Sequence, residues 1–488
     1  CTCSEHFKGT LCEIDIIKDS FLKTWNANLT AQLLISLTLN DVSTILTYCE
    51  NNANQNYKVG QVRFLFIHYL KGAFIGIRQF SDVIKKQRAW KLVTRFSMNI
   101  FALHSSEWPV KEMMKMVATT LGEENVGLAN PTDYKTGLQE VIRYAMEEIG
   151  TSPTLLGLVK INKEGLLHSN VQELQGLHGQ LMYIFIHQFI GGLVRFLFSM
   201  TWTPIEYIFD VIGLAIRTAI FSIQSTITGR SVSMVPMDST AIEEYVERIA
   251  GGAISGVAAA IEVSKTTSNK VITALHYVTI GKIISKSIVT GIFQMVIDVS
   301  KITGSIYLHQ IVSRGVYISI QYQLNTFTSS VCTCTRSQVL LSSTSGIYES
   351  LAIASSSSSS SSSSQLSSPE FKTMVRSVTK AQVHGLSLVS AFTESTGNVN
   401  ALVLLLQELL ARMLSLLPML LSVTSSSVIF VEEISHGFAQ SVSKYIIHVY
   451  NFLTTIQIET IIRNAATSTV QGVGSMRVAG GFNGNSTT

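Results

Sequence analysis

One stretch of the sequence, Ala401–Val423, restricts the fold more than any other. It reads ALVLLLQELLARMLSLLPMLLSV, and its main polar positions are Gln407, Glu408, Arg412 and Ser415. A helix that is apolar on nearly all sides must be buried in lipid, in a large core or against a partner chain. The stretch is long enough to cross a bilayer, but charges near the middle of a membrane are costly. We therefore predict the central helix of a soluble helical domain, covered by a second copy of the chain.

The composition favours a folded protein that either assembles or lies in a membrane. Hydrophobic residues make up 46% of the 488 residues, charged residues make up only 14%, and the mean hydropathy is +0.32. Such a chain is too apolar to be disordered, and a weakly charged surface repels its neighbours poorly. The net charge of +4 gives no electrostatic reason to expect nucleic acid as a partner. The length is sufficient for about three domains.

The cysteines indicate an oxidising compartment. They lack the C-x-x-C and histidine pattern of a zinc site, and their positions are Cys1, Cys3, Cys12, Cys49, Cys332 and Cys334. We therefore expect a secreted, extracellular protein. The first cysteines lie in Cys1–Asp15, which reads CTCSEHFKGTLCEID and resembles the closing half of an EGF-like module. A Cys-bearing leader with a chance match to that module is the alternative.

A run of serines marks the clearest domain boundary. Residues Ser355–Ser364 are all serine, and this composition is typical of a flexible linker. The chain then divides into a Cys-rich leader (1–18), a helical block (19–150), a long helical repeat block (151–354), the Ser-rich linker (355–368), a third helical block (369–470) and a disordered tail (471–488).

The long middle block contains two different apolar patterns. Its segment Ala241–Lys265 is rich in Gly and Ala, and small residues permit helices to approach closely. The segment Ile311–Val339 instead has β-branched residues at the spacing of a strand, at Val316, Ile318 and Ile320. A helix is therefore only weakly predicted for that second segment.

The sequence contains no recognisable catalytic or cofactor motif. It has no nucleophile elbow, no phosphate-binding loop and no H-E-x-x-H motif. The histidines on apolar or mixed segments lack the spacing of metal ligands, so core or surface positions explain them; they are His68, His104, His168, His178 and His187. We therefore expect no enzymatic activity, no metal, no cofactor and no small-molecule substrate.

The first helical block, Asp19–Gly150, resembles the N-terminal domain of spider silk proteins, the spidroins. Three landmarks carry this resemblance in the order that the family has. Ser20-Phe21-Leu22 with Trp25 resembles the start of the first helix, and Asp41-Val42-Ser43-Thr44-Ile45 resembles the Asp-Met-Ser-Thr-Ile segment. Gly127-Leu128-Ala129-Asn130-Pro131, followed by Gln139-Glu140-Val141, resembles the last turn and last helix.

The later blocks extend the resemblance. Ile212–Ala219 is similar to a helix in the repeat of tubuliform spidroins, although Ile, Val, Phe and Leu stand where silk repeats hold mostly Ala and Ser. Pro369–Ala466 resembles the spidroin C-terminal domain, in Arg376-Ser377-Val378, in Gln407-Glu408-Leu409-Leu410 and in Phe438-Ala439-Gln440-Ser441-Val442.

The resemblance implies that the N-terminal block dimerises on acidification through charged residues. Asp41 matches the family's aspartate, Glu140 matches the carboxylate of the last helix, and the family's lysine falls near Lys58. The two further carboxylates of the family fall near Phe74 and Gln79, which do not titrate. The resemblance therefore implies dimerisation with a weakened proton switch. For Asp41, a helix N-cap is the alternative.

In the third block, the resemblance implies an ion pair between Arg376 on the first helix and Glu408 on the central helix. The alternative is a pair within the central helix, since Glu408 and Arg412 stand at the favourable spacing of four residues. Either pair would make Arg376, Glu408 or Arg412 part of the surface through which the block dimerises.

These observations together predict an all-α fold of several helical bundles: an N-terminal five-helix-like bundle, a helical repeat domain and a C-terminal dimerisation domain. The function implied by the resemblance is that of a secreted silk-type structural protein. It would be stored in soluble form and assemble into fibre through dimerising terminal domains, with itself and other silk proteins as partners. The alternatives are an extracellular EGF-containing adhesion or matrix protein and a helical membrane protein that uses Gln180–Ile223 and Ala401–Val423.

Overall fold

The structure is a computed structural model of the whole chain. It describes residues 7–8, 14–15, 67, 70–77, 81–99, 110–125, 131–151, 171–201, 203–224, 239–267, 270–303, 308–327, 336–356, 368–393, 399–421, 427–447 and 454–478. Asp41 and Lys58 lie outside the described residues, so their assigned roles in dimerisation stay predictions.

The predicted all-α fold is confirmed for the described part of the chain. Two short strands, β1 (Phe7–Lys8) and β2 (Ile14–Asp15), form an antiparallel pair in the Cys-rich leader. The helices are α4 (Val83–Asn99), α5 (Val110–Asn125), α6 (Pro131–Thr151), α8 (Val171–Ser199), α9 (Ile205–Phe221), α11 (Ser239–Thr267), α12 (Ala274–Thr303), α13 (Leu308–Thr326), α14 (Arg336–Ser356), α15 (Ser368–Ser387), α16 (Ser390–Thr393), α17 (Val399–Ser415), α18 (Leu417–Leu421), α19 (Ser427–Ser441), the π-helix η5 (Val442–Ile447) and α20 (Thr455–Val478).

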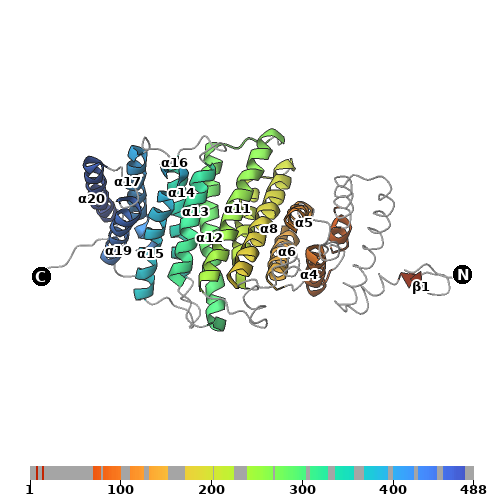
Figure 1. Ribbon diagram of the computed structural model, residues 1–488. Helices are drawn as coiled ribbons and strands as arrows, with labels where there is room; N and C mark the ends of the chain where they lie inside the picture. The colour runs from red at the N-terminus through yellow and green to blue at the C-terminus, as the bar shows by residue number, and fades with distance from the viewer. Residues whose placement is uncertain are drawn as a thin grey trace.

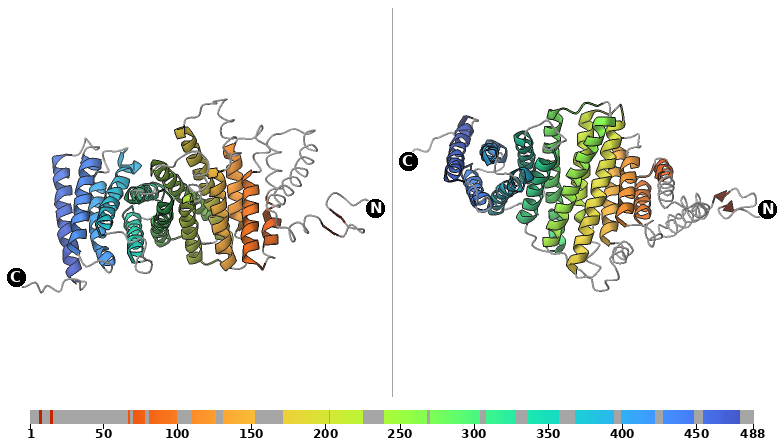
Figure 2. Two further views of the ribbon diagram at one scale, coloured as in Figure 1. Left: turned by 90° about the horizontal axis from the view of Figure 1, so that it is seen from below. Right: turned by 45° about the horizontal axis from the view of Figure 1, so that its top comes forward.

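The long helices stand side by side in two rows that run the length of the molecule (Figures 1 and 2). One row is α5, α8, α11, α13, α15 and α19, and the other is α4, α6, α9, α12, α14, α17 and α20. Successive long helices of the chain alternate between the two rows. In an arrangement of this kind each helix contacts only its near neighbours, so the array grows in one direction.

A single hydrophobic core fills the space between the rows, from Leu70 to Ile461. It continues past the serine run, because α13 packs on α15 and α14 packs on α17. Helix α20 also continues past residue 470, where the sequence predicts a disordered tail, and ends at Val478. The middle and third blocks are thus contiguous in space, and their independence as folding domains stays a prediction.

The small residues of Ala241–Lys265 permit a close helix contact, as predicted. They lie on α11, which packs along α8. A Cβ atom added at Gly252 would lie 2.8 Å from the backbone oxygen of Tyr183, and one added at Gly256 would collide with the backbone oxygen of His187. Glycine is therefore needed at both positions, because the obstacle is main chain and cannot move aside as a side chain could.

The weak helix prediction for Ile311–Val339 understated the helix content of this segment. Val316, Ile318 and Ile320 all lie on α13, and all three are buried. Helix α13 packs against α11 and α15 in its own row and against α12 and α14 in the other row. Because α13 is covered on several sides, apolar residues lie even at positions two apart, such as 316, 318 and 320, and this spacing is also typical of a strand.

A chain of buried hydrogen bonds crosses the array at this point. The side-chain amide of Gln323 donates to the hydroxyls of Ser285 and Ser319, both at 2.8 Å, and its oxygen accepts from Ser343 at 3.0 Å. These residues join α12, α13 and α14, and all of them are buried. Because unpaired polar groups in a core are costly, this network fixes how the three helices are aligned.

The apolar run Ala401–Val423 does not need a second copy of the chain to bury it. It forms α17 and α18, which α14, α19 and α20 cover within one molecule. From Leu402 to Leu420 the leucines of the run are buried, except for Leu404, which is 58% exposed. The expectation that a partner chain covers this helix is therefore wrong, because helices distant in the sequence already supply the cover.

Candidate functional site

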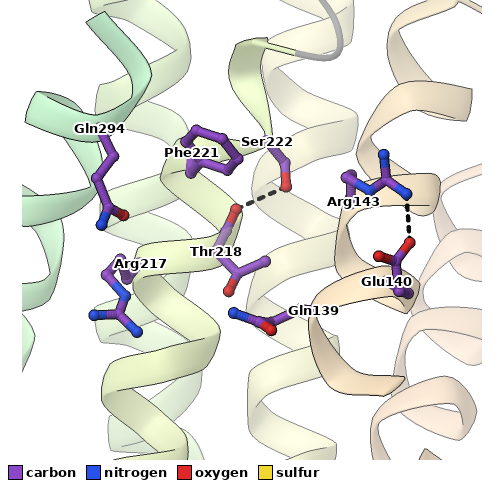
Figure 3. A pocket seen from close by; sticks show the side chains of 8 residues that line it. All are labelled: Gln139, Glu140, Arg143, Arg217, Thr218, Phe221, Ser222 and Gln294. Carbon is purple, nitrogen blue, oxygen red and sulfur yellow. Dashed lines mark hydrogen bonds and ion pairs between the residues drawn. The ribbon is translucent and has the colours of Figure 1, made fainter. Parts of the chain in front are cut away.

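A polar pocket of about 590 Å³ opens between α6, α9 and α12 (Figure 3). Its walls come from the predicted dimerisation residue Glu140 and from Gln139, Arg143, Arg217, Thr218, Phe221, Ser222 and Gln294. The inner wall is fixed by backbone contacts, since the Ser222 hydroxyl donates to the Thr218 carbonyl at 2.7 Å. The pocket presents amides and guanidinium groups, which bind polar groups, and it holds no activated nucleophile.

Two of the three charged residues that line this pocket, Glu140 and Arg143, pair with each other. Arg143 donates to the Glu140 carboxylate and lies over the Tyr144 ring, 4.4 Å from its centroid. Burial by itself would lower the pKa of Arg143, but Glu140 and Tyr144 raise it above its ordinary value. The structure thus places Glu140 beside a cation of the same helix. Its assigned part in dimerisation stays a prediction.

The charged residues of the third block have other partners than predicted. Arg376 on α15 pairs with Glu433 on α19, and its Nη2 atom donates to a Glu433 oxygen at 3.0 Å. Arg412 on α17 donates from Nη2 to the Ser345 hydroxyl at 2.7 Å. The Arg376–Glu408 pair is therefore wrong, and so is the Glu408–Arg412 alternative. Glu408 lies on the exposed face of α17, whereas Glu433 faces α15.

The end of the second row carries an apolar surface that the sequence did not predict. Helix α20 packs on α17 through a face that includes Ile461, which is 4% exposed. The opposite face carries Ile456, Ile462 and Val470, which are 75%, 59% and 72% exposed. Figure 1 shows α20 at the end of the array. The segment Ile456–Ile462 contains more isoleucines than one buried helix face can hold. This excess is visible in the sequence and could have indicated the open face.

Two charged residues lie on the same open face of α20. Glu459 and Arg463 are exposed and stand one helical turn apart. In the described part of the chain they lie in no ion pair, with each other or with another helix. The open face therefore combines apolar side chains with one unpaired charge of each sign.

Within the residues that the structure describes, two helical segments are long and apolar enough to cross a membrane, namely Gly179–Ser199 and Asn400–Leu420. Other helices bury 67% of the first window and 56% of the second. The central helix of a soluble protein has the same length and composition, so these two segments are weak evidence for a membrane protein.

No three His, Cys, Asp or Glu side chains within the described ranges are grouped so that they could hold a metal ion. The comparisons with known proteins add no family: no protein-family model matches the chain, and no curated protein matches it significantly.

Proposed function

We propose that this protein is a secreted structural protein of silk type that associates with copies of itself. The observation that carries the proposal is the open face of α20 at the end of a two-row helical array. Three features of the sequence support a silk-type function: the order of the spidroin-like segments, the low content of charged residues and the serine run. No catalytic step is needed for such a role.

The structural reason is that, among the described helices, none packs on the outer face of α20. An inner helix of a row is covered on both sides, as α17 is covered by α14 and α20. Helix α20 itself packs on α17 and, to a smaller extent, on α19. Arrays of stacked helices need a polar outer face on the last helix to remain soluble as monomers. Ile456, Ile462 and Val470 give α20 an apolar outer face instead.

A second copy of α20 fits this face by charge as well as by hydrophobicity. In a pair of identical helices related by a two-fold axis, residue i faces residue j and residue j faces residue i. With antiparallel helices and the axis near Ile461–Ile462, Glu459 of each copy faces Arg463 of the other. The contact then buries the open isoleucines and pairs both charges.

The experiment is to measure the mass of the full-length protein by light scattering and sedimentation over a wide concentration range. We expect wild type to form dimers or larger assemblies and the Ile456→Asp/Ile462→Asp double variant to sediment as a monomer. Leu275→Asp is the matched control, because Leu275 is 71% exposed on α12, away from α20. A wild-type monomer at every concentration, or equal loss of assembly in the control, would overturn the proposal.

An extracellular adhesion or matrix protein is the second candidate. The antiparallel pairing of β1 with β2, Phe7 opposite Asp15, favours a compact Cys-rich module at the start of the chain. Mass spectrometry of the secreted protein tests this candidate. Disulfides confined to the leader cysteines support a module of this kind, whereas free thiols at Cys1, Cys3 and Cys12 exclude it.

A further inference from the structure

A second cleft, of about 420 Å³, lies on the other row, where α11, α13, α15 and η5 meet. It is separate from the open face of α20 and from the pocket of Figure 3. Its floor is a stack of three rings: the His384 imidazole lies between Tyr317 and Tyr445, with centroid distances of 5.0 and 4.1 Å. The stack ties α13 and α15 to η5.

The position of Tyr445 depends on an irregular helix. Val442–Ile447 forms one turn of π-helix directly after α19. Such turns are rare and occur often at functional sites, because they redirect side chains that a regular helix would place elsewhere. Here the π-turn supplies both the Tyr445 ring and the neighbouring Lys444 ammonium, which lies 5.1 Å from the centroid of that ring.

Two of the cations around the cleft are already neutralised. Arg314 on α13 pairs with Glu247 on α11, and Arg376 on α15 pairs with Glu433 on α19. Glu243 on α11 is the single carboxylate that lines the cleft itself.

Among the described cations that line the cleft, Lys380 is the one outside the ion pairs. It lines the cleft from α15, is only partly exposed, and lies in no ion pair within the described residues. Lys444 stands nearby on η5, and the other titratable groups that line the cleft are His309, His384, Tyr317 and Tyr445. The cleft therefore has more positive than negative groups.

The pKa values of Lys380 and His384 are both lowered, which agrees with this excess of positive charge. Burial lowers the pKa of Lys380, and the neighbouring Arg376 and Lys444 lower it further, against a smaller opposing effect of Glu433. Burial likewise lowers the pKa of His384, with Arg314 and Lys444 acting in the same direction. Lys380 and His384 are four residues apart on α15, so both face the same space.

We propose that this cleft binds an oxyanion of the size of phosphate, held by the Lys380 ammonium at the junction of α13, α15 and η5. The hydroxyls of Ser377 and Tyr445 line the same space and can donate to the remaining oxygens. Hydrogen bonds to a charged partner of this kind are about twice as strong as neutral ones. The bound anion also offsets the repulsion among Lys380, Lys444 and the nearby arginines.

The proposal predicts a proton linkage with a definite sign. A bound anion stabilises the protonated imidazole of His384 and raises its pKa towards and above its ordinary value of 6.5. The anion must then bind more tightly as the pH falls through that range. NMR titration of the His384 ring in the full-length protein, with and without inorganic phosphate, measures this shift directly.

Calorimetry with the full-length protein tests the role of Lys380. We expect inorganic phosphate to bind wild type and Lys380→Arg, and to bind Lys380→Met about tenfold more weakly or worse. Lys372→Met is the matched control, since Lys372 lies on the same helix but does not line the cleft. Acetate at equal ionic strength is expected to bind much more weakly than phosphate, because it offers fewer acceptor oxygens.

Two arms of the experiment separate the sources of the anion. Binding of O-phosphoserine more tightly than inorganic phosphate points to a phosphorylated side chain, and equal or weaker binding points to the free ion. An unchanged His384 titration in phosphate, or equal loss of binding in the Lys372 control, overturns the proposal. The His384 titration uses wild-type protein and so decides the matter even if the Lys380 variants fold poorly.

Discussion

The α8–α11 contact and the α17–α20 contact lie in different rows and are built on opposite principles. In the first, glycines bring two long helices so close that main-chain atoms touch, and each partner also packs on a further helix of the same row. In the second, branched side chains hold α20 on α17, and the far side of α20 stays open. The comparison teaches that the inner helices of the array have neighbours on both sides, whereas α20, the last helix that the structure describes, keeps one side open.

The closest glycine contact between α8 and α11 gives a large expected effect. Gly256→Val places a side chain against the backbone of His187 on α8, and overpacking of this kind costs about 3 kcal/mol. Urea unfolding followed by circular dichroism measures the loss. Gly76→Ala is the control, because a Cβ at Gly76 meets nothing within 4 Å. An equal effect of both variants would contradict the close packing of α8 on α11.

Substitutions at two neighbouring isoleucines compare the packed side of α20 with its open side. Ile461→Ala removes a side chain buried against α17 and is expected to cost about 2–4 kcal/mol of unfolding free energy. Ile462→Ala removes an exposed one and is expected to change the unfolding free energy of the monomer by less than about 0.5 kcal/mol. The same unfolding experiment, run at low protein concentration, compares them. Reversed effects would mean that α20 packs by its other face.

A substitution in the buried hydrogen-bond network tests whether polar groups also align α12, α13 and α14. Gln323→Met keeps the shape of the side chain but leaves the hydroxyls of Ser285, Ser319 and Ser343 without their shared partner. The expected cost is about 1–3 kcal/mol, seen as a lower thermal midpoint. Gln321→Met, on the same helix but more exposed, is the control and is expected to be nearly neutral.

A smaller effect is expected from the ion pair between α15 and α19. Arg376→Ala leaves the Glu433 carboxylate, whose side chain is 11% exposed, without its cation, and should cost about 1–2 kcal/mol. Glu408→Ala should leave the thermal midpoint unchanged, because Glu408 is exposed and lies outside the ion pair. If Glu408→Ala were the more damaging substitution, the Arg376–Glu433 assignment would be wrong.

The smallest expected effect is a dependence of the unfolding free energy on pH, caused by two half-buried histidines. Burial lowers the pKa of both His187 and His384 below the ordinary value of 6.5. The folded state then binds these protons less readily than the unfolded state, so stability is full above pH 6.5 and declines as the pH falls below it. Thermal midpoints in buffers free of phosphate should show this decline, and a combined His187→Gln/His384→Gln variant should reduce it.

Much of the fold could be predicted from local patterns. The long apolar periods of Gln180–Ile223 and Ala401–Val423 predict buried helices, and the small residues of Ala241–Lys265 predict a close helix contact. The serine run starts in the last turn of α14 and ends before α15, and its role as a domain boundary stays a prediction. Val316, Ile318 and Ile320 were harder to interpret, because a helix covered on several sides can hold apolar residues two positions apart, as a strand does.

The candidate sites could not be predicted in the same way. The sequence spacing of Glu408 and Arg412 permits an ion pair, yet Arg412 turns towards Ser345 on a helix that is distant in the sequence. The cleft around Lys380 collects residues from α11, α13, α15 and η5, and no motif in the sequence connects them.

The sequence by itself determined that this chain forms long apolar helices with small residues at their contacts, because helix period and side-chain size are local properties. Only the tertiary structure decided which helix covers which, how Arg376 is paired, and that α20 keeps one apolar face open. Those outcomes depend on which surfaces meet when distant segments share one core, and a pattern within any single segment does not contain that information.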